Sequence, residues 1–410
     1  MSFEWPMVTI DDVCEMIVDC VNKTAPVVEE PTPYRMIRTT NIRNGRIDLS
    51  ECRFVDEATY VKWTRRAELR FGDVLLTREA PIGEVGFVLE PKGLFLGQRV
   101  MQYRANAKVL SPRFLLYSFL SPALQHQFGS HEGSGSVVSH IRVGDCFKFK
   151  LKLPSMAVQS EIAALLGALD DRIAVLRETN ATLEAIAQAL FKSWFVDFDP
   201  VRAKSQGLAP AGMDEATAAL FPDSFDESAL GLVPRAWSTG KVEDLLELAY
   251  GKALKATDRV AGDVPVYGSG GVTGLHNCAL VDSPTVVVGR KGTVGSLYWE
   301  DRPCFPIDTV FYVRARVPLT FCFYQLSVLG LEGMNTDGAV PGLNRNNVYR
   351  LAVVIPPPPV LAAFDELAAN LRSKIFANER QAQTLATLRD TLLPRLISGQ
   401  LRLPEVEAFA

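Results

Sequence analysis

Two helical seams, repeated at a fixed distance along the chain, constrain the fold more than any other feature of this sequence. The stretch that begins "LPSMAVQSEI" at Leu153 is echoed by "IPPPPVLAAF" at Ile355, an offset of 202 residues without a gap. In each copy, the leucine near the end of the helical pattern lies 36 residues after a proline, Pro154 or Pro356. Such a repeat predicts two copies of one unit, each a globular part followed by a helix of fixed length.

Within each predicted helix, one residue in every three or four belongs to a continuous stripe. The intervals alternate between four and three, the spacing of the a and d positions of a coiled coil. The second stripe keeps the phase of the first but is weaker, because alanines and Arg389 interrupt it. The first stripe consists of Ile162, Leu166, Leu169, Ile173, Leu176, Asn180, Leu183, Ala187, Leu190 and Trp194. The second consists of Phe364, Ala368, Leu371, Ile375, Asn378, Ala382, Leu385, Arg389, Leu392 and Leu396.

The two stripes are most readily buried against each other. A helix of 36 residues is about 54 Å long. If the helices are antiparallel and overlap fully, residue x faces residue 558 − x, so Asn180 meets Asn378. One buried polar pair fixes the register of a coiled coil at some cost in stability. The alternative, that each asparagine points to a solvated edge of the seam, stays open at this stage.

Upstream of each helix, short strand-like segments alternate with glycine, proline and asparagine breakers. The stretch "GDVLLTREAPIGEVG" is echoed by "SPTVVVGRKGTVGSL", which pairs Arg78 with Arg290 at an offset of 212 residues. Trp5, followed by "IDDV", likewise matches Trp237, followed by "VEDL". Because the offset differs from that of the helices, we expect globular parts of unequal length.

These patterns predict an α+β fold: two globular mixed α/β domains with pseudo-twofold symmetry, separated by an antiparallel coiled coil of two long helices. The stretch 197–232 holds seven acidic and two basic residues and is rich in Ala, Gly and Pro, which favours a linker. The expected segments are a first globular domain over 1–152, a first spacer helix over 153–197, a linker over 198–233, a second globular domain over 234–355 and a second spacer helix over 356–403.

Composition limits the class of protein. The 410 residues are 48% hydrophobic, enough for sizeable cores. No apolar run reaches the roughly 18 residues of a membrane span, and the N-terminal residues lack the regions of a signal peptide. We therefore expect a cytoplasmic protein without membrane contact. Seven scattered cysteines without a C-x-x-C pair argue against a disulfide framework or a zinc site and favour buried, reduced thiols.

Motifs that carry enzymatic chemistry are absent from the sequence. It contains no P-loop, no dinucleotide-binding glycine pattern after a strand and no H-E-x-x-H, and its four histidines are dispersed. We expect no catalytic residue and no metal ligand on this chain. A less favoured interpretation is an enzyme that acts on nucleotides through "GRKGTVG", residues 289–295; turnover by the isolated chain would favour it.

The net charge of −4 is unevenly distributed. From Arg35 to Arg70, nine basic residues stand against five acidic ones, enough for a basic face that neutralises phosphates. Glycine-rich loops in both halves carry Arg, Lys, Asn, Ser and Thr, side chains that read base edges or contact phosphates. For any single loop, an ordinary hairpin turn is the alternative. The candidate DNA-binding residues are Arg38, Thr39, Thr40, Asn41, Arg43, Arg78, Arg99, Ser136, His140, Tyr267, Ser269, Arg290, Lys291, Thr293 and Asn344.

The ends of the two helices carry a family resemblance. There, "ALFKSWFVDFDPV" and "LLPRLISGQL" resemble the two conserved-region endings of the specificity (S) subunit of type I restriction-modification systems. The stretches "VPVYGSGGVTGLHN", "VVVGRKGTVGSLYW" and "DTVFYV", in this order, are similar to the opening of many of that family's target-recognition domains. The resemblance covers about residues 5 to 403.

The resemblance implies a non-catalytic, sequence-specific DNA-recognition subunit that takes part in phage defence. Each globular domain is then a target-recognition domain that reads one half of a bipartite, asymmetric target in double-stranded DNA, and the helices set the spacing between the halves. The helices are also expected to dock two adenine-methyltransferase (M) subunits, and ATP-dependent restriction (R) subunits can join. AdoMet, ATP and Mg²⁺ are expected on those partner subunits, and no cofactor on this chain.

Aromatic residues crowd the end of the first helix. With the resemblance in view, Phe191, Trp194, Phe195 and Phe198 are the expected partner-docking residues, at a helix end where a second helix, a recognition domain and a partner subunit meet. Aromatic anchors of this kind dominate interface energies. The alternative is that they close a core within the chain, and a mixed role is the interpretation that we favour.

A non-catalytic protein–protein scaffold with tandem β-rich modules is the alternative function. It predicts association that is insensitive to salt, whereas phosphate contacts weaken steeply as the salt concentration rises.

Overall fold

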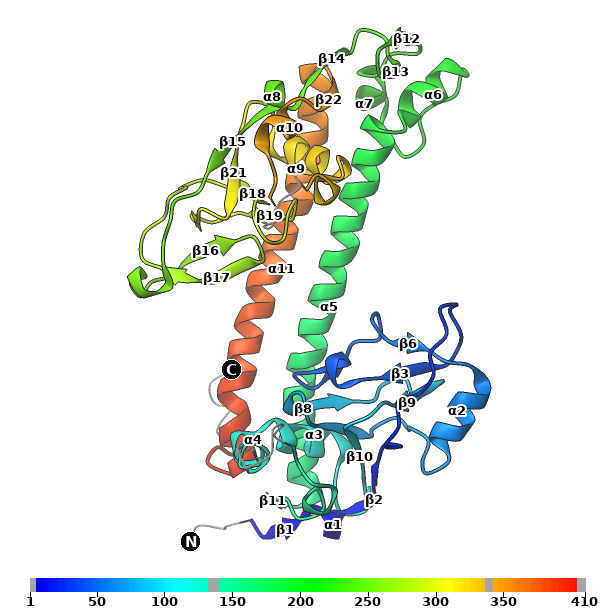
Figure 1. Cartoon of the computed structure of the whole chain (residues 1–410), viewed down its shortest axis with the longest axis vertical. Helices are drawn as coiled ribbons and strands as arrows, with labels where there is room; N and C mark the ends of the chain where they lie inside the picture. The colour runs from blue at the N-terminus through cyan, green and yellow to red at the C-terminus, as the bar shows by residue number, and fades with distance from the viewer. Residues whose placement is uncertain (1–4, 132–139, 336–341, 404–410) are drawn as a thin grey trace. The chain divides into compact units, whose positions relative to one another are not determined.

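The computed structural model describes residues 5–131, 140–335 and 342–403, and the chain divides into two compact units. Unit 1 comprises residues 1–175 and 381–410, and unit 2 comprises residues 176–380. The two longest helices continue from one unit into the other, so each unit consists of a globular part packed on a segment of both helices (Figure 1).

Helices α5 (Met156–Phe195) and α11 (Pro358–Ser398) follow from the repeated seam. All seam residues of both helices are buried or half-buried, and none is exposed, as the coiled-coil spacing predicts. Pro358 and Pro359 occupy the first turn of α11, where a missing N–H is harmless because the first amides of a helix have no partner within it. Both long helices predicted from the sequence are therefore present.

The α5 and α11 segments pack antiparallel in the register that the seam predicts. In unit 2, Asn378 Nδ2 donates to Asn180 Oδ1 at 2.8 Å, and Asn180 Nδ2 donates to the carbonyl oxygen of Ile375 at 3.1 Å. In unit 1, Arg389 Nη1 lies 2.6 Å from Asp170 Oδ1. The solvated-edge alternative is wrong for Asn378, which is 3% exposed. The arginine that interrupts the second seam has a charged partner on the other helix.

A four-stranded antiparallel sheet forms the centre of the globular part of unit 1. Its strands, in sheet order, are β2 (Cys14–Asp19), β10 (Val100–Ala105), β7 (Val74–Arg78) and β8 (Ile82–Phe87). Helices α3 (Pro112–Leu120) and α4 (Pro122–Gly129) contact the sheet and share its hydrophobic core with Ile162 and Leu166 of α5 and Leu396 of α11. The sheet, its helices and both long helices are thus held by one continuous core.

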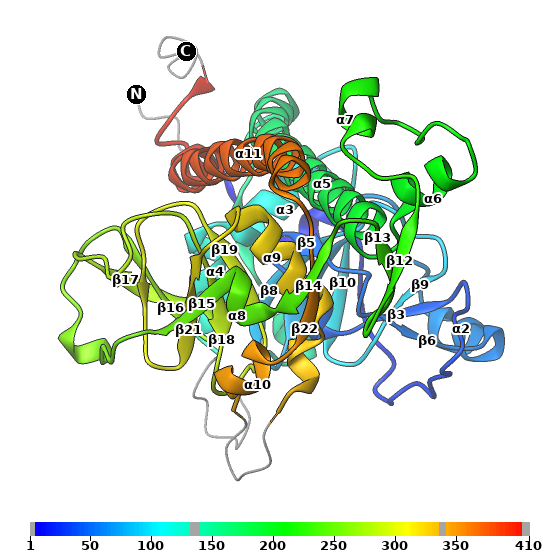
Figure 2. The same ribbon diagram turned by 90° about the horizontal axis from the view of Figure 1, so that it is seen from above.

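The central sheet of unit 2 has the same topology, with the first strand next to the last and the two middle strands following. Its strands, in sheet order, are β15 (Leu246–Tyr250), β21 (Val310–Ala315), β18 (Thr285–Gly289) and β19 (Leu297–Glu300), all antiparallel. Helix α9 (Leu319–Val328) lies between this sheet and the two long helices (Figure 2). The sequence repeat is therefore also a repeat of topology.

Each unit adds a small three-stranded sheet whose middle strand pairs parallel with one neighbour and antiparallel with the other. In unit 1 these are β6 (Arg53–Phe54), β3 (Arg35–Ile37) and β9 (Leu94–Leu96). In unit 2 they are β17 (Gly271–His276), β16 (Val264–Gly268) and β20 (Phe305–Pro306). Besides the hairpin of the linker, the two-stranded pairs are β1 (Met7–Thr9) with β11 (Lys150–Lys152), β4 (Ile42–Arg43) with β5 (Arg46–Ile47), and β14 (Ser238–Lys241) with β22 (Ala352–Ile355).

Short helices complete both units. In unit 1 they are α1 (Ile10–Val13), η1 (Thr39–Asn41), α2 (Glu57–Thr64) and η2 (Val143–Asp145). In unit 2 they are α8 (Val242–Leu245), η3 (Ala256–Asp258), η4 (Leu331–Gly333) and α10 (Arg345–Tyr349).

The predicted linker contains more secondary structure than its composition indicates. It forms α6 (Asp199–Ser205), α7 (Glu215–Ala219) and a hairpin of β12 (Phe225–Ser228) with β13 (Gly231–Pro234). Phe221, which lies between α7 and the hairpin, is buried, and its ring centroid lies 5.0 Å from that of Trp194. This segment is therefore fastened to the end of α5.

The aromatic residues at the end of α5 lie inside the core of unit 2. Phe191 packs on Phe364 of α11 with ring centroids 5.7 Å apart, and Phe195 packs on Phe321 of α9 at 5.1 Å. Trp194 and Phe198 are buried in the same core. The predicted alternative, a core closed within the chain, describes these contacts. Partner docking by these four residues stays a prediction, and their burial leaves little ring surface for a partner.

We expect Asn378→Ala to lower the free energy of unfolding by about 1–3 kcal/mol, because it leaves the amide of Asn180 without its buried partner. Replacing both asparagines by leucine is expected to restore or exceed the original stability, since apolar side chains fit the seam. Thermal denaturation of the purified full-length chain measures both changes. A double variant that is less stable than the single one would contradict a pair that mainly fixes register.

We expect Phe191→Ala to lower the free energy of unfolding by about 3–5 kcal/mol, because it opens a cavity between α5, α9 and α11. The matched control is Val196→Ala, one turn away and exposed, with an expected change within about 0.5 kcal/mol. Both are measured by thermal denaturation. Unchanged stability of Phe191→Ala would show that the ring serves a partner rather than this core.

Candidate nucleic-acid interface

One arginine occupies the same place in both units, at the end of a central strand. In unit 1 it is Arg78, the last residue of β7. Its N–H donates to the carbonyl oxygen of Arg99 at 2.8 Å, and its own carbonyl oxygen accepts the N–H of Ile141 at 2.9 Å. Arg78 Nη1 also donates to the carbonyl oxygen of Ile141 at 3.0 Å. The backbone of Arg78 is therefore fixed from both sides.

In unit 2 the equivalent residue is Arg290, directly after β18. Its N–H donates to the carbonyl oxygen of Thr309 at 3.0 Å, its carbonyl oxygen accepts the N–H of Leu343 at 2.8 Å, and Nη1 donates to the carbonyl oxygen of Asp308 at 3.1 Å. The sequence pairing of Arg78 with Arg290 is confirmed as a structural equivalence. Neither guanidinium forms an ion pair with another described residue, so both keep an uncompensated positive charge.

The turn at residues 38–43 lies against the segment that follows Arg78. Thr39 Oγ1 donates to the carbonyl oxygen of Ala80, two residues beyond that arginine, at 3.1 Å. Arg38 is half-buried and uses Nη2 for a backbone carbonyl, whereas Thr40 is exposed. The predicted residues of unit 1 are thus brought together by the fold rather than by the sequence alone.

Arg43 and Arg99 are exposed members of the same group, and each has a carboxylate nearby. Arg43 Nε lies 3.8 Å from Glu84 Oε1, and Arg99 Nε lies 3.1 Å from Glu79 Oε2. Arg99 has a φ of 70°, in the left-handed region that costs a non-glycine residue about 1 kcal/mol or more. Strained residues of this kind concentrate at binding sites.

The three remaining predictions for unit 1 have different outcomes. Asn41 is 2% exposed, and its Oδ1 accepts the N–H of Arg38 at 2.9 Å. Its side chain therefore shapes the turn and does not face a base edge, contrary to our expectation. His140 is half-buried next to Ile141, and Ser136 lies outside the described residues.

In unit 2, Arg290 belongs to a cluster of cations and aromatic rings. The Cζ atoms of Arg290 and Arg345 each lie 4.8 Å from the ring centroid of Tyr250, which is 48% exposed. Arg290 is also 5.7 Å from the ring of Phe311, and Arg345 is 5.9 Å from the ring of Tyr349. Cation–π contacts orient the two guanidiniums without neutralising them. Tyr250 and Arg345 were not among the candidates identified from the sequence, although Arg345 follows Asn344 directly, at the start of α10.

Four other candidates of unit 2 lie at turns or at a helix start. Lys291 and Thr293 are exposed in the turn between β18 and β19. Ser269 occupies the two-residue hairpin turn between β16 and β17, where its carbonyl oxygen accepts the hydroxyl of Ser296 at 2.7 Å. Asn344 is exposed, but its Oδ1 caps α10 by accepting the N–H of Asn346 at 2.9 Å. The hairpin-turn alternative is thus the structure found at Ser269.

Tyr267 is a residue of the core rather than of the interface. Its side chain is 6% exposed, and the hydroxyl donates to Glu300 Oε2 at 3.0 Å. Burial, followed by the Glu300 charge, raises the pKa of Tyr267. Burial works to raise the pKa of Glu300, but hydrogen bonds from Arg302 outweigh it and hold that pKa below the usual value. The expected base contact by Tyr267 is therefore wrong, because its only polar atom is occupied inside the protein.

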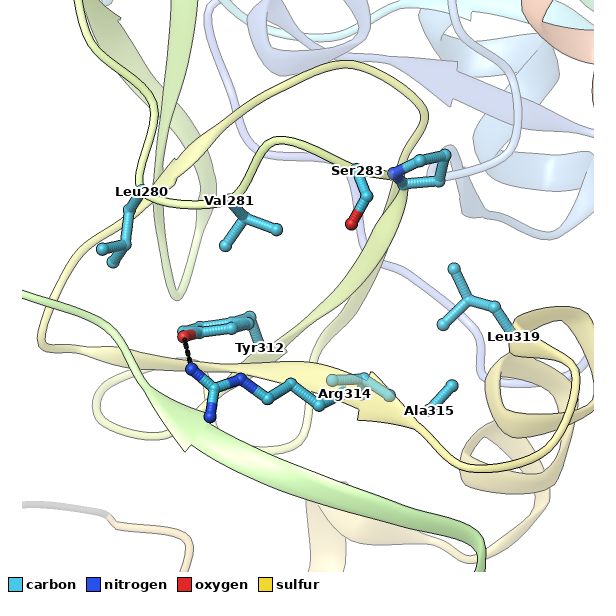
Figure 3. Close-up of a pocket in the computed structure, with 9 residues that line it drawn as sticks. Leu280, Val281, Ser283, Tyr312, Arg314, Ala315 and Leu319 are labelled. Carbon is cyan, nitrogen blue, oxygen red and sulfur yellow. Dashed lines mark hydrogen bonds between the residues drawn. The ribbon is translucent and has the colours of Figure 1, made fainter.

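An open cleft of about 360 Å³ lies at the start of β18 and the end of β21, away from Arg290 (Figure 3). It is lined by Leu280, Val281, Ser283, Pro284, Tyr312, Val313, Arg314, Ala315 and Leu319. Arg314 Nη2 donates to the Tyr312 hydroxyl at 2.9 Å and Nη1 pairs with Glu247 at 3.5 Å. Because its one cation is already paired and no predicted site residue lines it, this cleft is separate from the candidate interface.

The cysteines are free thiols. Five are buried and Cys14 is half-buried, but Cys278 is exposed, so the expectation of buried thiols is wrong there. Burial raises the pKa of both Cys52 and Cys146 to about 11, which keeps them protonated at neutral pH.

Across residues 5–131, 140–335 and 342–403, no three His, Cys, Asp or Glu side chains gather as a metal site would require. Among the described helices, none combines the length and apolar character that crossing a membrane requires.

Comparison with known proteins gives matches over most of the chain. The family model for the "Type I restriction modification DNA specificity domain" matches residues 3–185 and 234–360. The HindI specificity subunit of a type I restriction enzyme from Haemophilus influenzae is 24% identical over 404 residues, which cover 81% of this chain and 87% of that protein. The MjaIX specificity subunit from Methanocaldococcus jannaschii is 24% identical over 361 residues, 82% of this chain and 79% of the relative.

A solved structure shares the fold. The crystal structure of the type I restriction-modification S subunit from M. genitalium aligns over 97% of both chains with a TM-score of 0.60 and 17% sequence identity. The family model covers both globular parts and most of α5. On this match, and with the repeated sheet and the paired helices that the resemblance implies, the chain belongs to the type I restriction-modification DNA specificity family.

Proposed function

We propose that this chain is the sequence-specific DNA-recognition subunit of a type I restriction-modification complex. The observation that carries the proposal is the repeated arginine: in two units of one topology, an arginine at the end of a central strand forms no ion pair with any described residue and lies among polar turns. Each unit then reads one half of a bipartite, asymmetric target in double-stranded DNA. Membership of the specificity family supports the same role.

The chemistry of the turns fits DNA contacts of two kinds. Arg78 and Arg290 each retain guanidinium donors, and arginine recognises guanine through two parallel hydrogen bonds in the major groove. The exposed Thr40, Lys291 and Thr293 are suited to phosphate oxygens, which position a protein on the duplex without reading sequence. We expect neither kind of contact to require a catalytic residue on this chain, and we assign AdoMet, ATP and Mg²⁺ to partner subunits.

The long helices supply the spacing and the docking surface in this proposal. Two exposed apolar residues, Ile186 on α5 and Leu388 on α11, are separated by the helix offset of 202 residues. They are 49% and 45% exposed, so both helices present an equivalent apolar position. A repeated surface fits two copies of one partner, which we take to be the methyltransferase subunits in the cytoplasm. Restriction subunits would join the same complex.

We expect Arg78→Ala and Arg290→Ala each to relax one half of the target only. The test replaces the chromosomal gene and maps methylated adenines across the genome. The unaltered gene is expected to produce one bipartite motif, and each variant a motif that has lost specificity at one or two bases of one half, at a cost of about 1–3 kcal/mol per guanine contact. Arg314→Ala, at the cleft that lies at the opposite strand ends from Arg290, is the matched control and should leave the motif intact.

The dependence of affinity on salt concentration distinguishes the scaffold alternative from DNA recognition. On duplex DNA that carries the mapped motif, affinity should fall steeply between 50 and 200 mM salt, as is typical when phosphate contacts release counterions. The proposal is refuted in favour of a scaffold if the unaltered gene produces no bipartite motif and partner association does not respond to salt.

Shortening both helices together should shorten the spacer of the target. Deleting Arg172–Val175 from α5 and Gln383–Ala386 from α11, both within unit 1, removes about 6 Å of helix. One base pair rises about 3.4 Å, so we expect a spacer shorter by one or two base pairs with both half-sites unchanged. Methylation mapping reads this directly, and an unaltered spacer would contradict the role of the helices as a ruler.

A further inference from the structure

In both units, a buried tyrosine of the recognition domain is tied to α5 and α11 through a single carboxylate. In unit 1, the hydroxyl of Tyr117 on α3 donates to Asp170 Oδ2 of α5 at 2.8 Å. Asp170 Oδ1 accepts from Arg389 Nη1 of α11 at 2.6 Å. Three elements that are far apart in the sequence therefore meet at one aspartate, and the tyrosine is 1% exposed.

Unit 2 repeats the arrangement with different residues. The hydroxyl of Tyr324 on α9 lies 3.4 Å from Glu184 Oε2 of α5, and the same oxygen accepts from Arg372 Nη1 of α11 at 2.8 Å. Like α3, α9 follows the last strand of its central sheet, so the two tyrosines are topologically equivalent. In both units the carboxylate is on α5 and the arginine is on α11.

We refer to Tyr117, Asp170 and Arg389, and to Tyr324, Glu184 and Arg372, as the two triads. Each triad is also linked to the side of the domain that carries the candidate DNA contacts. In unit 1, Arg46 Nη2 donates to the backbone carbonyl of Asp170 at 3.0 Å, and Arg46 pairs across the β4–β5 hairpin with Arg43. In unit 2, the guanidinium of Arg372 lies 4.9 Å from the ring of Trp299 on β19, which is paired with β18, the strand that leads to Arg290. Movement at a triad would therefore displace the reading residues.

The physical properties of the triads are suited to fixing the orientation of each domain on α5 and α11. Burial, followed by the Asp170 charge, raises the pKa of Tyr117, and burial with Glu184 does the same for Tyr324. Both hydroxyls thus remain protonated donors at neutral pH. Apolar packing is not directional, whereas hydrogen bonds to charged groups depend on angle. The bond from Tyr117 is short, at 2.8 Å, and the contact from Tyr324 is longer, at 3.4 Å. The core holds each domain on the helices, and the directional contacts of the triad are suited to fixing its orientation.

We propose that Tyr117 and Tyr324 are positioning residues that set which half-site spacing the protein accepts. They touch no base in this scheme and act through the helices on the placement of the reading residues. The inference rests on the proposed function, because it assumes that two half-sites are read at a set separation. It predicts that loss of the two hydroxyls changes selectivity for the spacer and leaves selectivity for the half-sites unchanged.

The test uses the full-length chain in its own host, with the chromosomal gene replaced by a Tyr117→Phe and Tyr324→Phe double variant. Genome-wide mapping of methylated adenines reports half-sites and spacer length in the same experiment. We expect methylation at targets with a spacer one base pair longer or shorter to rise about ten-fold relative to the unaltered gene, the effect of losing one hydrogen bond to a charged group. The bases of both half-sites should be the same.

Tyr103→Phe is the matched control. Tyr103 is also a fully buried tyrosine of unit 1, but its hydroxyl donates to the carbonyl oxygen of Cys146 at 3.0 Å, within the globular part, and not to a residue of either long helix. It should retain the original spacer. Thermal denaturation of the purified chains compares the stabilities, and if the double variant folds poorly, the two single variants replace it in the same mapping experiment.

The outcomes separate this inference from the proposed function. A bipartite motif with the unaltered gene and unchanged spacer selectivity in the tyrosine variants overturns the positioning role alone. Equal loss of half-site and spacer selectivity also overturns it, because that pattern indicates general loosening of the fold. Absence of any bipartite mark with the unaltered gene refutes the proposed function instead.

Discussion

The register between α5 and α11 is the constraint on which the rest of the structure depends. An apolar seam alone would allow the helices to slide by a heptad with little change in buried area. The pairing of Asn180 with Asn378 in unit 2 and of Asp170 with Arg389 in unit 1 allows one register. A heptad slip moves a helix by about 10 Å, which would leave buried amides and charges without partners at a cost of about 1–3 kcal/mol each.

Polar groups inside the seam are better explained by specificity than by stability. Replacing a buried ion pair by apolar residues is often neutral or stabilising, because desolvation offsets the attraction between the charges. The side chains of Arg389 and Asp170 are about one-fifth exposed, which reduces the desolvation cost but also screens the attraction. Such pairs contribute little free energy to folding, yet removing one partner is costly. They therefore discriminate between packings, as expected where the separation of two domains matters more than their stability.

The sequence predicts the long-range repeat better than it predicts the residues that use it. The seam residues, the meeting of Asn180 with Asn378 and the equivalence of Arg78 with Arg290 follow from periodicity and offset, which one chain displays directly. The Tyr117 and Tyr324 triads do not, because they join elements 53 and 140 residues apart with no shared motif. Burial explains the failures: Asn41 and Tyr267 have the chemistry of base-reading residues, but the fold turns both inward. Tyr250 was missed for the opposite reason, since an aromatic residue at a strand end is read from sequence as core.

The residues that hold each domain on the helices differ from the residues of the turns that carry the candidate contacts. This separation affects how such a protein acquires new targets. The core, the triads and the central strands hold each domain on the helices, whereas the candidate contacts lie on turns that bond mainly to backbone carbonyls. Backbone carbonyls are present whatever side chain their residue carries, so a substitution at Glu51, Ile141 or Asp308 leaves the acceptor for the neighbouring arginine in place. The two units already differ in this respect: the exposed candidates of unit 1 are Thr40, Arg43 and Arg99, whereas in unit 2 Arg290 and Arg345 both lie over the ring of Tyr250. One topology with two different sets of donors is what an asymmetric bipartite target requires.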